Sequence, residues 1–339
     1  MVMVNKPMID GIQILRGLAA FLVIVRHGTK EIDGFNFEVG QFGVDLFFVI
    51  SGFVIYLTSR NVDWRTFAKK RLVRIVPLYW LVSSIALMGA VLLAKGTMNE
   101  VFYEFVLSLL FIPHGDLFPI LYVGWTLNYE MWFYLIFGAL IFFNANLLNG
   151  ASITIFALVM LGLILLLFND WEVTPFTVPL LPITLEFLAG VWIAYFYING
   201  FNFSKAFCVF LLSVALIWLW FAPNASAYTI WRPMAWALPA ALIVVSFLGL
   251  EKHVSFRKLT VLMLLGNASY ATYLIHPLII RFTIIANEKV LDGKLDAWPL
   301  LIVLVLGSIL AGLAFHLTFE RFLINFFNGL FLNKKLKTC

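Results

Sequence analysis

Long apolar runs separated by short polar segments recur along the whole chain. A helix needs about twenty apolar residues to cross the hydrocarbon core of a bilayer, and about ten runs approach or exceed that length. We therefore predict an all-α, polytopic integral membrane helical bundle, with residues 1–339 forming a single transmembrane domain. The predicted spans are 10–29, 42–60, 74–94, 124–143, 151–168, 180–199, 204–222, 232–250, 266–287 and 298–327.

One further apolar piece, residues 101–112, is too short to span, because roughly twelve residues precede the next proline. We expect it to enter and return, or to lie in the interface. The charges of the loops support this expectation. The 60–74 segment is strongly basic and is predicted to be cytoplasmic, like the basic 251–258 loop and the C-terminal tail, whereas the acidic 29–40 and 169–178 loops should face outward. These loop charges are consistent with one topology only if residues 101–112 do not cross the membrane. In that topology both termini are cytoplasmic.

Composition supports the membrane setting and narrows the partners. The hydrophobic fraction is 63% and only 12% of residues are charged, where a soluble domain has about a quarter. Because the net charge of +5 lies mostly in short loops between spans, we expect membrane lipids rather than nucleic acid as partners. The first run lacks the cleavage pattern of a signal peptide. Cys208 and Cys339 suggest neither a disulfide framework nor a metal cluster.

Arg16 and His27 lie inside the first apolar run and are the most informative pair in the sequence. A cation and an imidazole are costly within a bilayer and are usually functional there. Eleven residues at about 100° each return to within roughly 20° of the starting direction, and they rise about 16 Å. Both side chains therefore share one helical face, with Arg16 in the cytoplasmic half and His27 near the outer end. We expect this polar face to guide a ligand into the membrane.

Two carboxylates are candidates to act beside His27. Asp45 lies near the outer start of the second span and Glu130 in the outer half of the fourth, at about the depth of His27. An imidazole beside a carboxylate suits a general base, because the acid fixes the tautomer and stabilises the imidazolium. The alternatives are that Asp45 pairs with Arg26 or caps its helix, and that Glu130 pairs with Arg281.

Arg71 and Arg74 open the third span on its cytoplasmic side. Residues three apart are neighbours on a helical face, and guanidinium groups bind oxyanions through a fork-shaped set of donors. The pair therefore suits a phosphate-bearing ligand at a membrane entrance. The alternative is that the two arginines set the topology or contact lipid phosphates.

Ser269, Tyr273 and His276 follow an i, i+4, i+7 pattern and share one face of the ninth span. His276 falls near mid-membrane, where it either lines a ligand path or forms a packing hydrogen bond beside Pro277.

Glu186 also lies within an apolar run and is expected to line the interior. Three histidines lack a polar constellation and are interpreted as structural or solvated: His114, His253 and His316. The sequence contains no metal-ligand spacing, P-loop, dinucleotide fingerprint or serine-nucleophile elbow.

Six segments in this order resemble the acyltransferase-3 family of integral membrane O-acyltransferases, over nearly the whole chain. They are Arg16-Gly-Leu-Ala with His27, Gly43-Val-Asp45-x-Phe-Phe-x-x-Ser51-Gly-Phe, Arg71-x-x-Arg74-Ile-x-Pro-x-Tyr-Trp, Trp125-Thr-Leu-x-x-Glu130, Glu186-x-x-x-Gly190 and Ser269-Tyr-x-x-Tyr273-Leu-x-His276-Pro. One departure lies near the C-terminus, where Glu320-Arg321-Phe322 stands in place of the Glu, basic residue and Pro of many relatives. That departure weakens any role for this end of the chain.

In that family, cytoplasmic acyl-CoA donates an acetyl group to a sugar hydroxyl on the outer side of the membrane. The resemblance implies that Arg71 and Arg74 hold CoA phosphates and that Arg16 lines the donor channel. It also implies that His27 is the catalytic base and Glu130 its carboxylate partner. No permanently bound cofactor is expected, since acetyl-CoA is the acyl donor.

Ser51 and Tyr273 are candidates for the donors to the tetrahedral oxyanion. Direct transfer and a short-lived acyl-histidine both stay open. The sequence thus predicts a bacterial inner-membrane O-acetyltransferase acting on an exopolysaccharide or similar surface glycan, polymeric or lipid-linked. The rival is a transporter or flippase for a glycan or glycolipid, since multi-span bundles with buried charges are often transporters. Against the rival, the chain shows no repeat symmetry and its paired arginines suit a phosphorylated donor.

Overall fold

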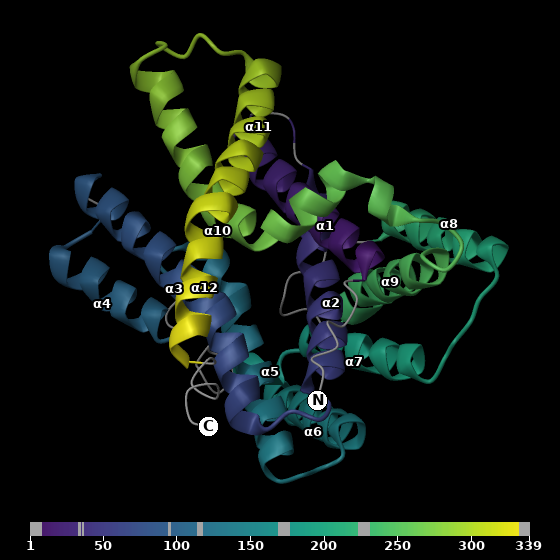
Figure 1. Ribbon diagram of the computed structural model, residues 1–339. Helices are drawn as coiled ribbons and strands as arrows, with labels where there is room; N and C mark the ends of the chain where they lie inside the picture. Colours follow the sequence, from purple (N-terminus) through teal and green to yellow (C-terminus); the bar gives the residue numbers. More distant parts are fainter. Residues whose placement is uncertain are drawn as a thin grey trace.

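The computed structural model describes residues 9–32, 35, 37–93, 96–113, 118–168, 177–222 and 231–331, and every regular element in these ranges is helical (Figure 1). The α-helices are α1 (Asp10–Lys30), α2 (Phe42–Ser59), α3 (Trp64–Leu92), α4 (Met98–Leu109), α5 (Trp125–Phe142), α6 (Leu147–Phe168), α7 (Thr184–Ile198), α8 (Lys205–Phe221), α9 (Leu238–Leu250), α10 (Thr260–Lys289), α11 (Ala297–Phe315) and α12 (Arg321–Phe331). Short turns used below are η2 (Tyr122–Gly124), η4 (Pro233–Ala237) and η6 (His316–Glu320).

The predicted spans are all represented by helices. Among the described residues, seven helices are long and apolar enough to cross a membrane, and α7 and α8 are shorter apolar helices. The remaining predicted span corresponds to α5, whose first half carries Asn128 and Glu130. The short piece expected around 101–112 is the 12-residue helix α4. The chain is therefore a polytopic helical membrane bundle, as its apolar pattern predicts.

Several helix boundaries differ from the prediction by a few residues, and two differences are larger. α3 begins at Trp64, ten residues before the predicted span, because Asp63 caps its first turn by accepting a hydrogen bond from the Thr66 backbone N–H at 3.0 Å. The segment expected to be a basic loop is therefore mostly helical. The last predicted span is divided by the π-helical turn η6, which joins α11 to α12.

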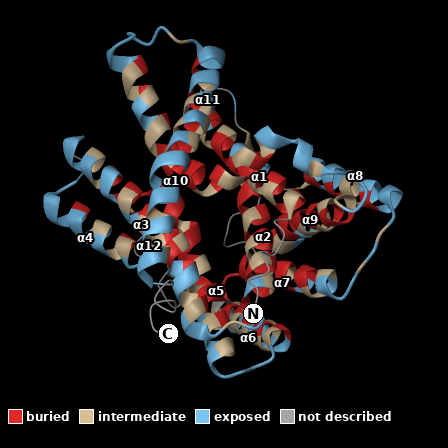
Figure 2. Cartoon of the chain, in the orientation of Figure 1, coloured by how far each residue is buried: buried red, intermediate tan, exposed pale blue. Residues whose placement is uncertain are grey.

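α1 and α2 lie at the centre of the bundle, where buried residues concentrate, whereas α4 and α8 are largely exposed (Figure 2). α2 packs along α7 through two glycines. A Cβ at Gly52 would collide with the backbone carbonyl oxygen of Phe187, and a Cβ at Gly190 with that of Val49. Small residues allow helix backbones to approach this closely in a membrane. This requirement gives a physical reason for glycine at both positions.

α1 packs along α10 in the same manner, since a Cβ at Gly266 would collide with the backbone carbonyl oxygen of Gln13. This contact brings the polar face of α1 against the polar face of α10. His27 and His276 therefore meet across the two helices, 249 residues apart in sequence.

The N-terminus of α1 is anchored by Glu251, the residue that follows the last turn of α9. Ile9, the N-cap residue, provides no side-chain hydrogen bond. Instead, the Glu251 carboxylate accepts hydrogen bonds from the backbone N–H groups of Asp10 and Gly11, at 2.8 and 3.1 Å. Burial raises the pKa of the Glu251 carboxyl, while the two backbone donors act in the opposite direction. A carboxylate at this end also matches the positive pole of the helix dipole.

We expect Gly190→Ala to destabilise the bundle, because the added Cβ would meet backbone that cannot rotate away. Overpacking of this kind costs about 3 kcal/mol, and thermal unfolding in detergent measures it. Gly138→Ala is the matched control, since a Cβ at Gly138 meets nothing within 4 Å and alanine favours the helix. Equal unfolding temperatures for the two variants would contradict this account of the α2–α7 contact.

Candidate active site

His27 on α1 and His276 on α10 form a hydrogen-bonded pair. The distance from His27 Nδ1 to His276 Nε2 is 2.9 Å, and the rings stack with centroids 5.0 Å apart. His276 is fully buried, while His27 is partly exposed and its ring meets the ring of Tyr122 edge to face at 5.1 Å. One imidazole nitrogen of the pair must donate and the other accept. The contact therefore fixes the orientation of His27 and couples its tautomer to that of His276.

The expected carboxylate partners do not reach His27. Among the described residues, neither Asp45 nor Glu130 hydrogen-bonds it, and His276 occupies its Nδ1. Both carboxylates are candidates because their predicted depth in the membrane matches that of His27. The helix faces that carry them, however, point toward other neighbours. The expectation of a carboxylate beside His27 was thus wrong in geometry, and the imidazole of His276 takes that place.

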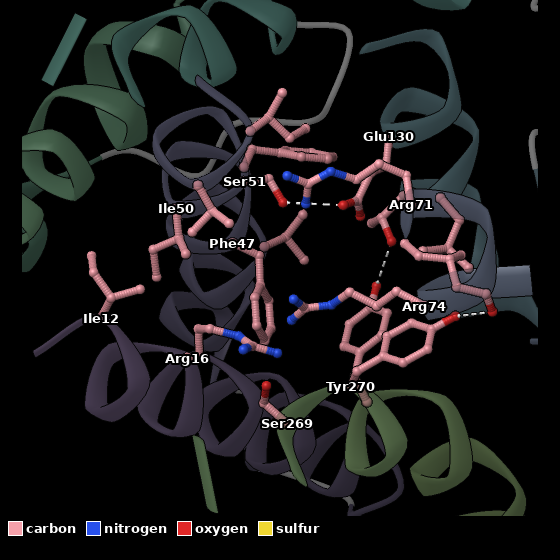
Figure 3. A pocket seen from close by; sticks show the side chains of 18 of the residues that line it. Ile12, Arg16, Phe47, Ile50, Ser51, Arg71, Arg74, Glu130, Ser269 and Tyr270 are labelled. Atoms are coloured by element: carbon pink, nitrogen blue, oxygen red, sulfur yellow. Dashed lines mark hydrogen bonds between the residues drawn. The ribbon is translucent and has the colours of Figure 1, made fainter. Parts of the chain in front are cut away.

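A cavity of about 140 Å³, referred to below as the inner cavity, lies among α1, α2, α3, α5 and α10. Its charged lining residues are Arg16, Arg71, Arg74 and Glu130. Figure 3 shows the guanidinium groups of Arg16 and Arg74 pointing into the same space beside Phe47. The ion pairs among the described residues involve neither Arg16 nor Arg74. Two cations that face a cavity without a carboxylate partner favour an anionic ligand.

The two arginines of α3, which are expected to hold a phosphate-bearing ligand together, differ in their surroundings. Arg71 is buried, donates a hydrogen bond to the hydroxyl of Thr58, and lies over the rings of Phe67 and Tyr134 at 5.6 and 5.7 Å. Arg74 is half-buried, and its side chain has no hydrogen bond or ring contact of this kind within the described part of the chain. Arg71 therefore has structural contacts on α2 and α5, whereas Arg74 is available to a ligand.

Glu130 faces the inner cavity from α5. It accepts a hydrogen bond from the Tyr134 hydroxyl at 2.6 Å and a longer one from Ser51 Oγ at 3.4 Å, and Figure 3 shows the Ser51 contact. The alternative pairing with Arg281 does not form. Ser51 is thus positioned at the cavity wall by a carboxylate.

Tyr273 closes the end of the inner cavity that is nearest to the histidine pair. Its hydroxyl donates to the Val123 carbonyl at 3.0 Å and lies 3.1 Å from Thr126 Oγ1. Its ring centroid is 5.8 Å from that of His276 and 5.7 Å from that of Phe47. The histidine pair therefore lies one side chain beyond the cavity. Ser269 lines the same cavity from the same face of α10, as its spacing predicts.

Asp45 belongs to a separate, fully buried cluster. Its Oδ2 accepts a hydrogen bond from Arg232 at 2.8 Å, and Arg232 Nε lies 3.4 Å from Glu186 Oε1. Arg232 also lies over the ring of Trp236 at 5.7 Å. Arg26, the other partner considered for Asp45, pairs with Glu38 at 2.5 Å. The cluster joins α2, α7 and η4, which indicates that Asp45 holds helices together.

The sequence interpretation missed two groups of residues. Arg232 lies at the edge of a predicted span. It could have been identified from the sequence because two acids inside apolar runs require a cation close to them. His316, expected to lack partners, lies 2.6 Å from Glu320 through Nδ1 and accepts from Arg321 Nε at 3.3 Å through Nε2. His253 lies near the Phe203 carbonyl at the surface, as expected of a solvated residue. The prediction for His114 falls outside the described residues.

The described residues contain no group of three or more His, Cys, Asp or Glu side chains that could hold a metal ion. What the arrangement offers is an oriented pair of imidazoles, and an interior cavity lined by cations and one carboxylate, Glu130. The fold and the site thus define a polytopic helical membrane protein with an arginine-lined interior cavity close to a histidine pair.

A match to the family described as "Acyltransferase domain" (Acyl_transf_3) covers residues 9–317, and the chain belongs to this acyltransferase-3 family. It is 34% identical over 306 residues to the exopolysaccharide production protein ExoZ of Rhizobium meliloti (strain 1021), covering 86% of this chain and 92% of that protein. No solved structure matches the chain. The family resemblance inferred from the six segments is thus confirmed.

We expect Arg232→Met to destabilise the protein strongly, because it leaves Asp45 and Glu186 buried without their cation. Removing one partner of a buried ion pair costs about 3–5 kcal/mol, and thermal unfolding in detergent measures the loss. Arg26→Met is the comparison, since its partner Glu38 is partly exposed and the cost should be smaller. A wild-type unfolding temperature for Arg232→Met would contradict a stabilising role for the cluster.

Proposed function

We propose that this protein is a multi-pass inner-membrane O-acetyltransferase that transfers an acetyl group from cytoplasmic acetyl-CoA to a hydroxyl of a surface polysaccharide, with both termini in the cytoplasm. The observation that carries the proposal is the proximity of the cationic cavity to the histidine pair. Cations line one end of an interior cavity, and an oriented histidine pair lies just beyond the other end. Membership of an acyltransferase family and similarity to an exopolysaccharide production protein support the reaction class and the acceptor.

The donor would enter at the end that carries Arg16 and Arg74. These two guanidinium groups have no ion-pair partners among the described residues and can hold phosphate oxygens. The uncharged pantetheine arm and the thioester would extend through the largely apolar inner cavity toward Tyr273. Arg71 would contribute mainly by holding α3 against α2 and α5.

His27 would act as the general base. With Nδ1–H donating to His276 Nε2, its own Nε2 is the unprotonated nitrogen and can accept the proton of the acceptor hydroxyl. The hydroxyl oxygen forms a bond to the thioester carbon, and the carbon–sulfur bond then breaks. The leaving thiolate takes the proton from His27, so that atoms and charge balance without another reactant.

His276 would be a positioning residue in this mechanism. A carboxylate in its place would stabilise the imidazolium by charge, whereas a neutral imidazole supplies only tautomer and orientation. Ser51 would be a candidate donor to the oxyanion, because its hydroxyl lies at the cavity wall. Tyr273 is less suited to that role in this arrangement, since its hydroxyl already donates to the Val123 carbonyl.

The first test compares surface polysaccharide from cells with the gene, without it, and with His27→Ala. We expect mass spectrometry to show loss of an acetyl-sized group in both the deletion and the variant, because a general base contributes about 10²–10⁴-fold to the rate. Immunoblotting of membranes controls for insertion of the variant. Unchanged acetylation, with polymer accumulating inside the cell, would favour the transporter instead.

A second test addresses the role of His276 in the histidine pair. We expect His276→Phe to lower kcat by about a hundredfold, with little change in KM for the donor, because His27 then loses its fixed tautomer. His276→Asn, whose carbonyl oxygen can accept from His27 Nδ1, should recover part of the rate. The surface variant His253→Phe is the control and should keep wild-type kcat. Equal rates for His276→Phe and the wild type would remove His276 from the mechanism.

A further inference from the structure

A second and larger cavity, of about 560 Å³, adjoins the inner cavity at its cationic end. We call it the mouth cavity. The two cavities share Gln13, Arg16 and Arg74 as lining residues. Its volume lies in the range of ligand sites, about 300–1,000 Å³. A ligand seated there could therefore extend directly into the inner cavity.

The charges that line the mouth cavity are mostly positive. Arg16, Lys70, Arg74 and Arg321 provide four cations, and Glu320 is the only carboxylate among the described lining residues. Like charges gathered around one space repel each other unless an anion lies between them. Arginine and lysine together bind phosphate groups well, arginine as a fork and lysine as a compact charge. The cavity thus favours a ligand with several phosphate groups.

Glu320 is hydrogen-bonded to His316, and among the described residues it forms no ion pair with these four cations. Its Oε2 lies 2.6 Å from His316 Nδ1, and Arg321 Nε donates to His316 Nε2 at 3.3 Å. Because arginine can only donate, His316 Nε2 is the acceptor and Nδ1–H donates to Glu320. The imidazole and the carboxylate are both buried, whereas Arg321 is exposed. The arrangement orients Arg321 through Nε and leaves its terminal NH₂ groups available.

Two elements bring these residues to the cavity. The π-helical turn η6 carries His316 and Glu320, and π-turns within helices are often found at functional sites. α12 then packs against α3 and passes beside it in Figure 1. This contact places Arg321 on the same side of the bundle as Lys70 and Arg74.

We propose that the mouth cavity binds the phosphate-bearing nucleotide end of the acyl donor. Lys70 and Arg321 join Arg16 and Arg74 as phosphate ligands, and His316 and Glu320 are positioning residues for Arg321. The identity of the donor rests on the proposed function, whereas the anion site rests on the cavity itself. An anionic lipid headgroup offers the same chemistry, but the joined cavities favour a ligand that also reaches inward.

The test measures binding to the full chain in nanodiscs of zwitterionic lipid. Calorimetry with coenzyme A, dephospho-coenzyme A and acetylpantetheine separates the contribution of the phosphates from that of the arm. We expect Arg321→Gln and Lys70→Gln each to weaken coenzyme A binding about tenfold, the loss of one charge-assisted contact. Acetylpantetheine binding should not change in either variant. Arg257→Gln, which removes a charge outside the cavity, is the matched control and should bind like the wild type.

The positioning role of His316 can be tested separately through the affinity for coenzyme A. His316→Phe should weaken coenzyme A binding about as much as Arg321→Gln, and the double variant should lose no more than either single variant, because both changes act through one side chain. His316→Gln, whose amide can accept from Arg321 and donate to Glu320, should recover most of the affinity. Additive losses in the double variant, or no recovery with His316→Gln, would overturn this role.

The outcomes separate the site from the reaction. Coenzyme A affinity that is equal in Arg321→Gln, Lys70→Gln and the wild type would overturn the proposal. Loss of coenzyme A binding on adding anionic lipid, with the variants affecting only the lipid, would assign the cavity to headgroups and overturn it too. Binding with the expected variant effects but no acetyl transfer to any glycan would support the anion site while contradicting the proposed function.

Discussion

A charged side chain inside an apolar helical bundle must either meet a counter-charge or face a cavity that a ligand or water can fill. The interior of this protein contains both solutions. Arg232 is enclosed by Asp45 and Glu186, and this cluster joins three elements of the bundle. Arg16 and Arg74 face a cavity instead, and neither takes part in an ion pair among the described residues. The first solution joins helices, and the second leaves two guanidinium groups facing a cavity.

The helix packing brings this cavity close to the histidine pair. The close contact of α1 with α10 places His27 against His276, and the contact of α2 with α7 positions the wall that carries Ser51. One helix, α1, therefore provides both the cation at the cavity and the imidazole beyond it. Because its N-terminus is held by Glu251, this helix cannot slide along the bundle without losing two backbone hydrogen bonds.

Much of the fold could be predicted from the sequence because lipid imposes long apolar runs, and these runs marked the spans and the short α4. The earlier start of α3 was missed because hydropathy reports apolar length, whereas the helix begins at the Asp63 cap. The face shared by Arg16 and His27 followed from helical periodicity alone. The partner of His27 did not, since depth limits the candidates but cannot determine which neighbouring helix a side chain faces. Arg232 escaped notice for the same reason.

In the proposed reaction, donor and acceptor reach His27 from opposite sides of the membrane. Oriented proteoliposomes can test this arrangement, with radiolabelled acetyl-CoA supplied on one side and a glycan acceptor on the other. We expect acetylated glycan only when the donor is on the side that carries Lys70 and Arg74 and the acceptor is on the opposite side. Equal acetylation with the donor on either side, or acetylation only when both reactants share the side nearer His27, would contradict it.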